Sequence, residues 1–166
     1  MKTIRIGSGA GYAGDRIEPA MELIEKGNLD YIIFECLAER TVAIGQQDKE
    51  KDSEKGYNQL LEYRMKKILP LLFHNHVKMI TNMGAANPKA AARQTKKIAE
   101  ELGISGLKIA CVTGDDITDK LEQYMGNTVL ENGKQLEELR DSLISANVYM
   151  GSEGIQEALA GQADIV

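Results

Sequence analysis

The chain has 166 residues, 43% of them hydrophobic and 27% charged, which is the composition of an ordinary globular protein with one core. Its 20 basic and 25 acidic residues give a net charge of −5, and the basic residues form no cluster, which argues against nucleic acid and anionic membranes as main partners. No run of about 18 apolar residues occurs and the N-terminus lacks a signal peptide, so we expect a cytoplasmic protein with no membrane contact.

Short apolar segments alternate with amphipathic segments along the whole chain. The apolar segments predict six strands. Several of them, such as Tyr31–Glu35, begin with a continuous apolar run, which is typical of strands that are covered on both faces in a parallel sheet. The predicted strands are Thr3–Ile6, Tyr31–Glu35, Val77–Thr81, Lys108–Thr113, Asn147–Met150 and Ala163–Val166.

Apolar residues at helical spacing fill the intervals between these strands. Three longer helices are predicted from Ile17, Met21 and Ile24 ahead of Gly27, from Tyr57, Leu61, Met65 and Ile68 ahead of Pro70, and from Ala91, Ile98 and Leu102 behind an Asn87–Pro88 start. Three shorter ones are predicted from Asp116 to Tyr124, around Leu136, Leu139 and Leu143, and from Ser152 to Gly161.

This alternation predicts an α/β fold with a mainly parallel sheet and helices on both faces, in the doubly wound arrangement. A fragment of an α/β barrel is the second choice. Residues 1–166 are expected to form a single domain, with Gln46–Lys55 as a loop or helix end and residues 126–134 as the turn of a small hairpin. Because the chain stops inside the apolar segment Ala163–Val166, we expect an N-terminal fragment of a longer domain.

Ligands of parallel sheets bind beyond the carboxyl ends of the strands, and five of the predicted strands end in small, polar or acidic residues. The segment Gly7–Arg16 contains a G-x-G-x-x-G pattern, whose amides would suit a phosphate or carboxylate. Because the first strand is predicted to end at Ile6, ahead of that pattern, another ligand site is favoured over a dinucleotide site, and a tight turn is the third interpretation. The predicted ligand-binding residues are Gly7, Ser8, Gly9, Gly11, Gly14, Asp15, Arg16, Asn82, Asn87 and Asp116.

Carboxylates at the same strand ends are candidates for catalysis. We predict Glu35, Glu39 and Asp115 as acid–base residues. Together with other nearby carboxylates they would form an acidic ring suited to a divalent cation. The metal ligands stay unassigned, and a divalent metal and a coenzyme A ester are both open as cofactors. The other members of this ring are Asp15, Asp116 and Glu153, of which the first two also fit the simpler role of helix caps.

Glu35 has the strongest case for a functional role. It follows an apolar strand, where an unpaired carboxylate would be costly. We therefore expect Arg16, Arg40 or a ligand as its partner.

The loop motifs, in this order, resemble those of the acyclic terpene utilisation family. The residues that carry the resemblance are G-S-G-A-G-Y-A-G-D-R at 7–16, D-Y-I-I-F-E-C-L-A-E-R-T at 30–41, N-M-G-A-A-N-P at 82–88, V-T-G-D-D at 112–116 and the segment from 146 to 166. The resemblance covers the whole chain as the N-terminal part of a longer family domain. It implies a role in cytosolic catabolism of small branched carboxylic acids or their coenzyme A esters, and it does not name the reaction.

Three functions are open at this point. The first is an enzyme, or part of one, that acts on a small acyl or carboxylate substrate. The second is a nucleotide-binding Rossmann-like module, and the third is a non-catalytic assembly subunit. A small-molecule ligand is the expected partner, together with a second copy of the chain or a downstream partner domain.

Overall fold

The computed structural model describes residues 3–166, which divide into two compact units. Unit 1 contains the chain up to Val112 together with Ser152–Val166, and unit 2 is Thr113–Gly151. None of the helices in the described part of the chain has the length and apolarity needed to cross a membrane. The expectation of a single domain stays a prediction.

Unit 1 is built on a parallel sheet whose strands follow the order β1–β2–β3. Ile165 extends this sheet, because it forms parallel bridges with Met79 and with Ile109. The sheet stays open, which confirms the predicted α/β class and rules out a closed barrel within residues 3–166. The three strands are Ile6–Ala10 (β1), Tyr31–Phe34 (β2) and Lys78–Thr81 (β3).

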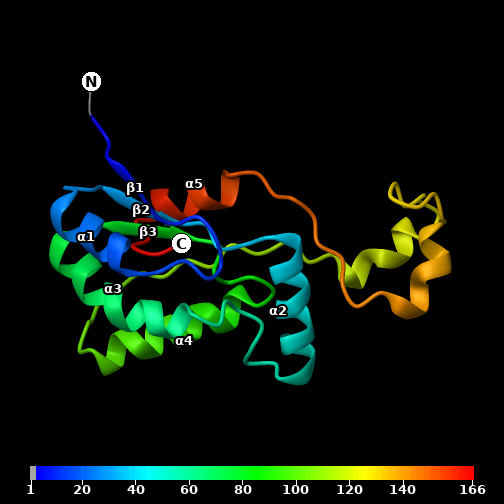
Figure 1. Ribbon diagram of the computed structural model, residues 1–166, viewed down its shortest axis with the longest axis horizontal. Helices are drawn as coiled ribbons and strands as arrows, with labels where there is room; N and C mark the ends of the chain where they lie inside the picture. The colour runs from blue at the N-terminus through cyan, green and yellow to red at the C-terminus, as the bar shows by residue number, and fades with distance from the viewer. Residues whose placement is uncertain (1–2) are drawn as a thin grey trace. The chain divides into compact units, whose positions relative to one another are not determined.

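Helices cover both faces of this sheet (Figure 1). The helices α1 (Glu18–Lys26), α3 (Leu61–Asn75) and α4 (Pro88–Glu101) lie on one face, and α5 (Glu153–Ala160) lies on the other. The chain advances across the sheet in one direction from β1 to β3, and it returns in the opposite direction from Ile109 to Ile165. Right-handed crossovers in opposite directions place their helices on opposite faces of the sheet, which explains this arrangement. The doubly wound prediction is therefore confirmed.

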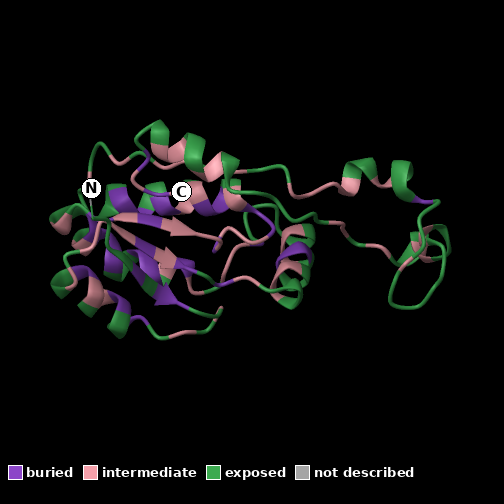
Figure 2. Cartoon of the chain, turned by 90° about the horizontal axis from the view of Figure 1, so that it is seen from above, coloured by how far each residue is buried: buried purple, intermediate pink, exposed green. Residues whose placement is uncertain are grey.

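The core of unit 1 lies between the sheet and α1, α3 and α4. Buried positions are concentrated in the strands and in the helix faces that meet them (Figure 2). Helix α3 contributes Leu61, Met65, Ile68 and Leu72 from one face, and these residues belong to the same buried cluster as Phe34 of β2. Complete burial of a side chain of this size stabilises the fold by about 1.5–3 kcal/mol.

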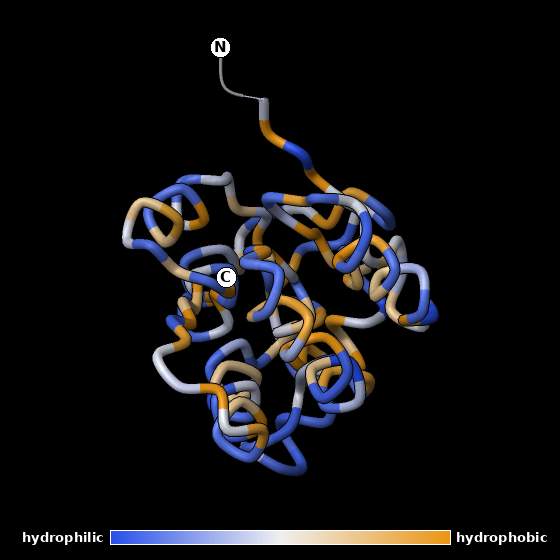
Figure 3. Tube along the Cα trace, turned by 90° about the vertical axis from the view of Figure 1, so that its left-hand side faces the viewer, coloured by the Kyte–Doolittle hydropathy of each residue, from blue (hydrophilic) through white to orange (hydrophobic). Residues whose placement is uncertain are grey.

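The first strand begins and ends later in the chain than predicted. The first described residues alternate between hydrophobic and hydrophilic character (Figure 3), and that alternation led to the prediction of a strand at Thr3–Ile6. The observed strand is Ile6–Ala10, so Gly7 and Gly9 are strand residues and the loop starts only after Ala10. A Cβ atom at Gly9 would lie 2.6 Å from Cζ of Phe34, so this glycine makes room for a core ring.

Two further predicted strands do not form regular strands. In the segment Lys108–Thr113, only Ile109 forms a bridge, to Ile165. In the segment Asn147–Met150, Asn147 forms an antiparallel bridge to Asp116. The prediction of six strands was therefore wrong, although the segment that ends at Val166 does pair with the sheet through Ile165.

Two helices differ from the prediction. Helix α3 continues to Asn75 through Pro70, whose ring lies exposed on the helix surface while Leu72 is buried on the opposite side. Helix α2 (Glu39–Lys51) occupies much of the segment predicted as a loop or helix end. This helix has no long apolar stripe, because its buried residues are Gly45 and Gln46, and periodicity could not reveal it.

Unit 2 consists of two 3-10 helices and a tight turn. The 3-10 helices, η1 (Thr118–Tyr124) and η2 (Leu136–Ser142), confirm the two short helices predicted here. An antiparallel bridge between Thr128 and Gln135 closes the turn predicted at residues 126–134. Arg140 binds Glu122 and Glu137, and these hydrogen bonds hold the pKa of both carboxyl groups below the usual range.

Gly9→Ala tests the revised position of β1. The added methyl group would overlap the fully buried ring of Phe34, so we expect the free energy of unfolding to fall by about 1–3 kcal/mol in urea denaturation. Gly11→Ala is the matched control, because a Cβ atom there has no neighbour within 4 Å. Equal stability of the two variants would contradict this packing.

Candidate functional site

A pocket of about 330 Å³ opens in unit 1 beyond the carboxyl ends of β1 and β2. This volume falls in the range of small-molecule sites, about 300–1,000 Å³. Its walls come from the loops that follow the three strands, from helix α2, and from the segment ahead of α3. The lining residues are Ala13 and Gly14, Cys36, the α2 residues Thr41, Ile44, Gly45 and Asp48, the segment 57–60, and Ala85.

Most polar groups in these walls already have partners in the protein. The Asn58 amide donates to the carbonyl of Ala13 (3.3 Å) and accepts from the amide of Leu60 (2.8 Å). The Thr41 hydroxyl bonds to the backbone of Ala38, from which it accepts at 2.7 Å and to which it donates at 2.8 Å. The side chains of Ile44 and Leu60 add apolar surface, so the pocket suits a hydrocarbon chain better than a highly polar ligand.

Close backbone contact fixes helix α2 against the segment that precedes α3. A Cβ atom at Gly45 would lie 2.8 Å from the carbonyl oxygen of Gly56, and Gly56 has a φ of +102°. The Gly56 carbonyl accepts a hydrogen bond from the amide of Ala86 (2.9 Å). The contact between these two walls of the pocket therefore depends on Gly45 and Gly56, which were not predicted as site residues.

Arg64 of α3 lies beneath the pocket and is only 1% exposed. Its guanidinium donates to the carbonyl of Asp15 at 2.6 Å and to Sγ of Cys36 at 3.1 Å. It also lies 3.6 Å from Sδ of Met83. One buried cation thus connects the loops after β1, β2 and β3.

Cys36 lines the pocket and is almost fully buried. Burial raises the pKa of its thiol, the nearby charge of Arg64 opposes that effect, and the carboxylates of Glu35 and Asp15 raise the pKa further. The thiol is therefore the dominant form at neutral pH.

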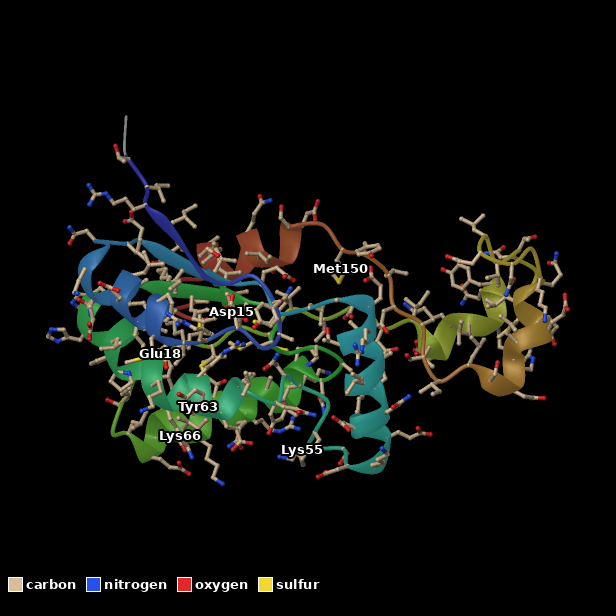
Figure 4. All side chains as sticks on the ribbon, in the orientation of Figure 1. Asp15, Glu18, Lys55, Tyr63, Lys66 and Met150 are labelled. Carbon is tan, nitrogen blue, oxygen red and sulfur yellow. The ribbon has the colours of Figure 1, made fainter. Side chains whose placement is uncertain are left out.

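Asp15 occupies the backbone amides that were predicted to hold an anion. Its carboxylate accepts from the amide of Gly11 at 3.0 Å and from that of Arg16 at 3.0 Å. It lies in the loop between β1 and α1 (Figure 4). The helix that follows has Glu18 in its first turn and Pro19, which has no amide hydrogen. This geometry gives no support to phosphate binding at Gly7–Gly14.

Glu35 is exposed, so the burial cost that motivated its selection does not arise. Its Oε1 atom accepts from the Asn82 side chain at 2.9 Å and from the amide of Leu37 at 3.0 Å. Oδ1 of Asn82 in turn accepts from the amide of Cys36 at 2.6 Å. The partner is therefore Asn82 of the loop after β3, where an arginine or a ligand was expected. Glu35 and Asn82, both predicted site residues, do lie together beside the pocket-lining Cys36.

The remaining predicted site residues lie in several places. Gly7, Ser8 and Gly9 belong to β1, and Glu39 is the first residue of α2. Asn87 caps α4 through the amide of Ala90 (3.3 Å). The other residues of the predicted acidic ring are Asp115, Asp116 and Glu153.

Asp115 and Asp116 belong to unit 2, where both make local hydrogen bonds. Asp115 accepts from the side chain of Asn147 at 2.9 Å, and Asp116 accepts from the hydroxyl of Thr118 at 2.6 Å. Glu153 is the first residue of α5. Among residues 3–166, no three His, Cys, Asp or Glu side chains gather in a way that would hold a metal ion.

Sequence reasoning missed Arg64 and the residues of α2 that line the pocket. One signal was available, because Arg64 falls between Leu61 and Ile68 on the apolar face of α3, where a charged residue is unusual. Ile44 and Asp48 gave no such signal, since α2 lacks an apolar stripe.

The sequence profile described as acyclic terpene utilisation family protein AtuA matches residues 4–166, essentially the whole chain. The chain belongs to the acyclic terpene utilisation family. Neither a curated protein nor a solved structure matches it with significant similarity. Family membership indicates a role related to acyclic terpene utilisation and agrees with the apolar character of the pocket.

Arg64→Met tests whether the buried guanidinium holds the three loops. Methionine keeps much of the volume but removes the donors to Asp15 and Cys36, so we expect unfolding to become easier by about 1–3 kcal/mol. Lys67→Met, at an exposed position of the same helix, should change stability by less than about 0.5 kcal/mol. Thermal and urea unfolding would measure both, and a neutral Arg64→Met would contradict this role.

Proposed function

We propose that the chain is a cytoplasmic catabolic enzyme, or the ligand-binding part of one, that acts on small branched carboxylic acids or their coenzyme A esters. The observation that carries this proposal is the pocket beyond β1 and β2, whose free surface is mainly hydrocarbon. Its position agrees with the general location of ligand sites in open α/β sheets. Membership of the acyclic terpene utilisation family supplies the substrate context.

The branched hydrocarbon chain of the substrate is the part that the pocket would hold. Ile44 and Leu60 provide aliphatic contact from two different walls. Burial of each methylene group in such a site contributes about 0.8 kcal/mol. The reacting head group would then lie toward Cys36 and the Glu35–Asn82 pair.

Glu35 is the proposed general acid–base residue. It is exposed to solvent, and the amide of Asn82 fixes one of its carboxylate oxygens at 2.9 Å. A carboxylate that is oriented in this way and lies near a ligand can take or give a proton during reaction. Glu39 is the second candidate on this side of unit 1, at the start of α2. We leave Asp115 and Asp116 out of the proposed site because their carboxylates make local hydrogen bonds within unit 2.

The nucleotide-binding alternative has less support than the enzyme. It depended on free amides in the loop after β1, and the carboxylate of Asp15 accepts hydrogen bonds from two of them. A phosphate would have to displace that carboxylate and would be repelled by Glu18 in the first turn of α1. The assembly-subunit alternative stays a prediction, and ligand binding with turnover would exclude it.

Ile44→Asp tests binding of the hydrocarbon chain. The probe is citronellol, an acyclic terpene alcohol with a branched hydrocarbon chain. The substitution places a charge on the apolar wall, so we expect the affinity for citronellol to fall at least tenfold, equivalent to about 1.4 kcal/mol, in isothermal titration calorimetry. Gln47→Asp introduces the same charge at an exposed position of α2 outside the lining and should leave the affinity unchanged. Equal affinities for the two variants would refute binding in this pocket.

Glu35→Gln tests the proposed catalytic role. The amide keeps the size of the side chain and its hydrogen-bond acceptor but cannot take up a proton, so turnover should fall by a factor of about 10²–10⁴ with ligand affinity maintained. Growth on citronellol of a strain that requires this protein would report turnover, and Glu25→Gln on the exposed side of α1 is the control. Normal growth with Glu35→Gln would remove Glu35 from the mechanism.

A further inference from the structure

We propose that the pocket accepts the branched acyl chain as an uncharged thioester and excludes the free carboxylic acid. This inference rests on the proposed function, because it chooses between the two substrate classes named there. It concerns the charge of the ligand head group, which the family description does not specify.

The lining of the pocket contains no group that would neutralise an anion. Among its twelve lining residues, all within the described part of the chain, none is Lys, Arg or His. The one acidic residue among them is Asp48, on α2. A ligand carboxylate that enters the pocket would therefore lose its hydration and would be repelled by the carboxylate of Asp48.

Arg64 is a buried cation next to this wall, but it is not one of the residues that line the pocket. Its guanidinium donates to Cys36, which does line the pocket, and the N–S distance is 3.1 Å. The same guanidinium is bound to the carbonyl of Asp15 at 2.6 Å. Because Arg64 is only 1% exposed, a ligand carboxylate could reach it only by displacing part of the core.

The glycine-rich segment offers no second anion site. The amides of Gly11 and Arg16 already donate to the carboxylate of Asp15, each at 3.0 Å. The carboxylate of Glu35, held by the amide of Leu37 and the side chain of Asn82, is a further acidic group next to Cys36 in the chain. Burial of an unpaired carboxylate in this setting is strongly unfavourable, whereas a thioester carries no charge and loses little on leaving water.

If the protein binds the thioester and excludes the free acid, a reaction that converts the acid to the thioester must precede its own step. Formation of a thioester from a carboxylate requires the loss of one carboxylate oxygen, which a nucleoside triphosphate can accept. In the first step the carboxylate displaces pyrophosphate and forms an acyl-nucleotide. In the second step a thiol displaces the nucleoside monophosphate, which retains the carboxylate oxygen, and a proton is released. An acyl-activating ligase of this class would supply the substrate.

Calorimetric titration of the full chain with three probes tests the inference. The probes are the pantetheine thioester of citronellic acid, citronellic acid itself, and citronellol. At pH 7.5 we expect the thioester and citronellol to bind and the acid to bind at least 100-fold more weakly than citronellol. Below pH 5, near the pKa of an aliphatic carboxylic acid, the acid should gain affinity relative to citronellol.

A variant pair sharpens the test. Asp48→Asn replaces the carboxylate of the lining with an amide and should strengthen binding of citronellic acid relative to that of citronellol several-fold at pH 7.5. Asp52→Asn, at the exposed C-terminal end of α2, is the matched control. Binding of citronellic acid as tight as that of citronellol at pH 7.5 would overturn the inference and leave the proposed function standing. Failure of all three probes to bind would instead overturn the proposed function.

Discussion

The buried guanidinium of Arg64 is the interaction on which the candidate site depends. A cation that is 1% exposed is costly unless its donors are satisfied, and the partners of Arg64 come from the loops after all three strands. The carbonyl of Asp15 fixes the first loop and the sulfur of Cys36 fixes the second. The carboxyl edge of the sheet is thereby held in one arrangement, and the pocket is one consequence of that arrangement.

The electrostatic balance of the site follows from the same arrangement. The carboxylate of Asp15 accepts hydrogen bonds from the amides of Gly11 and Arg16, so these two amides are not free to bind a phosphate. Asn82 orients Glu35 and also accepts from the amide of Cys36, so the acidic group lies beside the pocket and not inside it. The mainly apolar pocket agrees with a role related to acyclic terpene utilisation, which is what the family of this chain indicates.

Sequence patterns predicted those elements whose signals are local. The apolar run at Tyr31–Phe34, the stripe of α1 and the Asn87–Pro88 start of α4 each depend on near neighbours, and the structure contains all three. Gly9 was wrongly predicted to lie in a loop. Its role is to make room for the ring of Phe34, and the spacing of residues along the chain cannot reveal that contact. Helix α2 was missed because contact with Gly56, and not an apolar stripe, holds it in place.

The candidate site was predictable in position and only partly in composition. A location beyond the strand ends follows from the α/β fold, whereas the hydrogen bond between Asn82 and Glu35 joins two candidate residues that the sequence did not pair. The pocket itself is formed by segments from Ala13 to Ala85, and Arg64 connects them from α3, a helix whose apolar stripe indicates a role in the core.

Intermolecular nuclear Overhauser effects with bound citronellol would show whether the ligand occupies the pocket. We expect contacts between the methyl groups of the ligand and those of Ile44 and Leu60, because both residues line the pocket beyond β1 and β2. Contacts to other methyl groups, with none to Ile44 or Leu60, would place the ligand elsewhere and refute binding in this pocket.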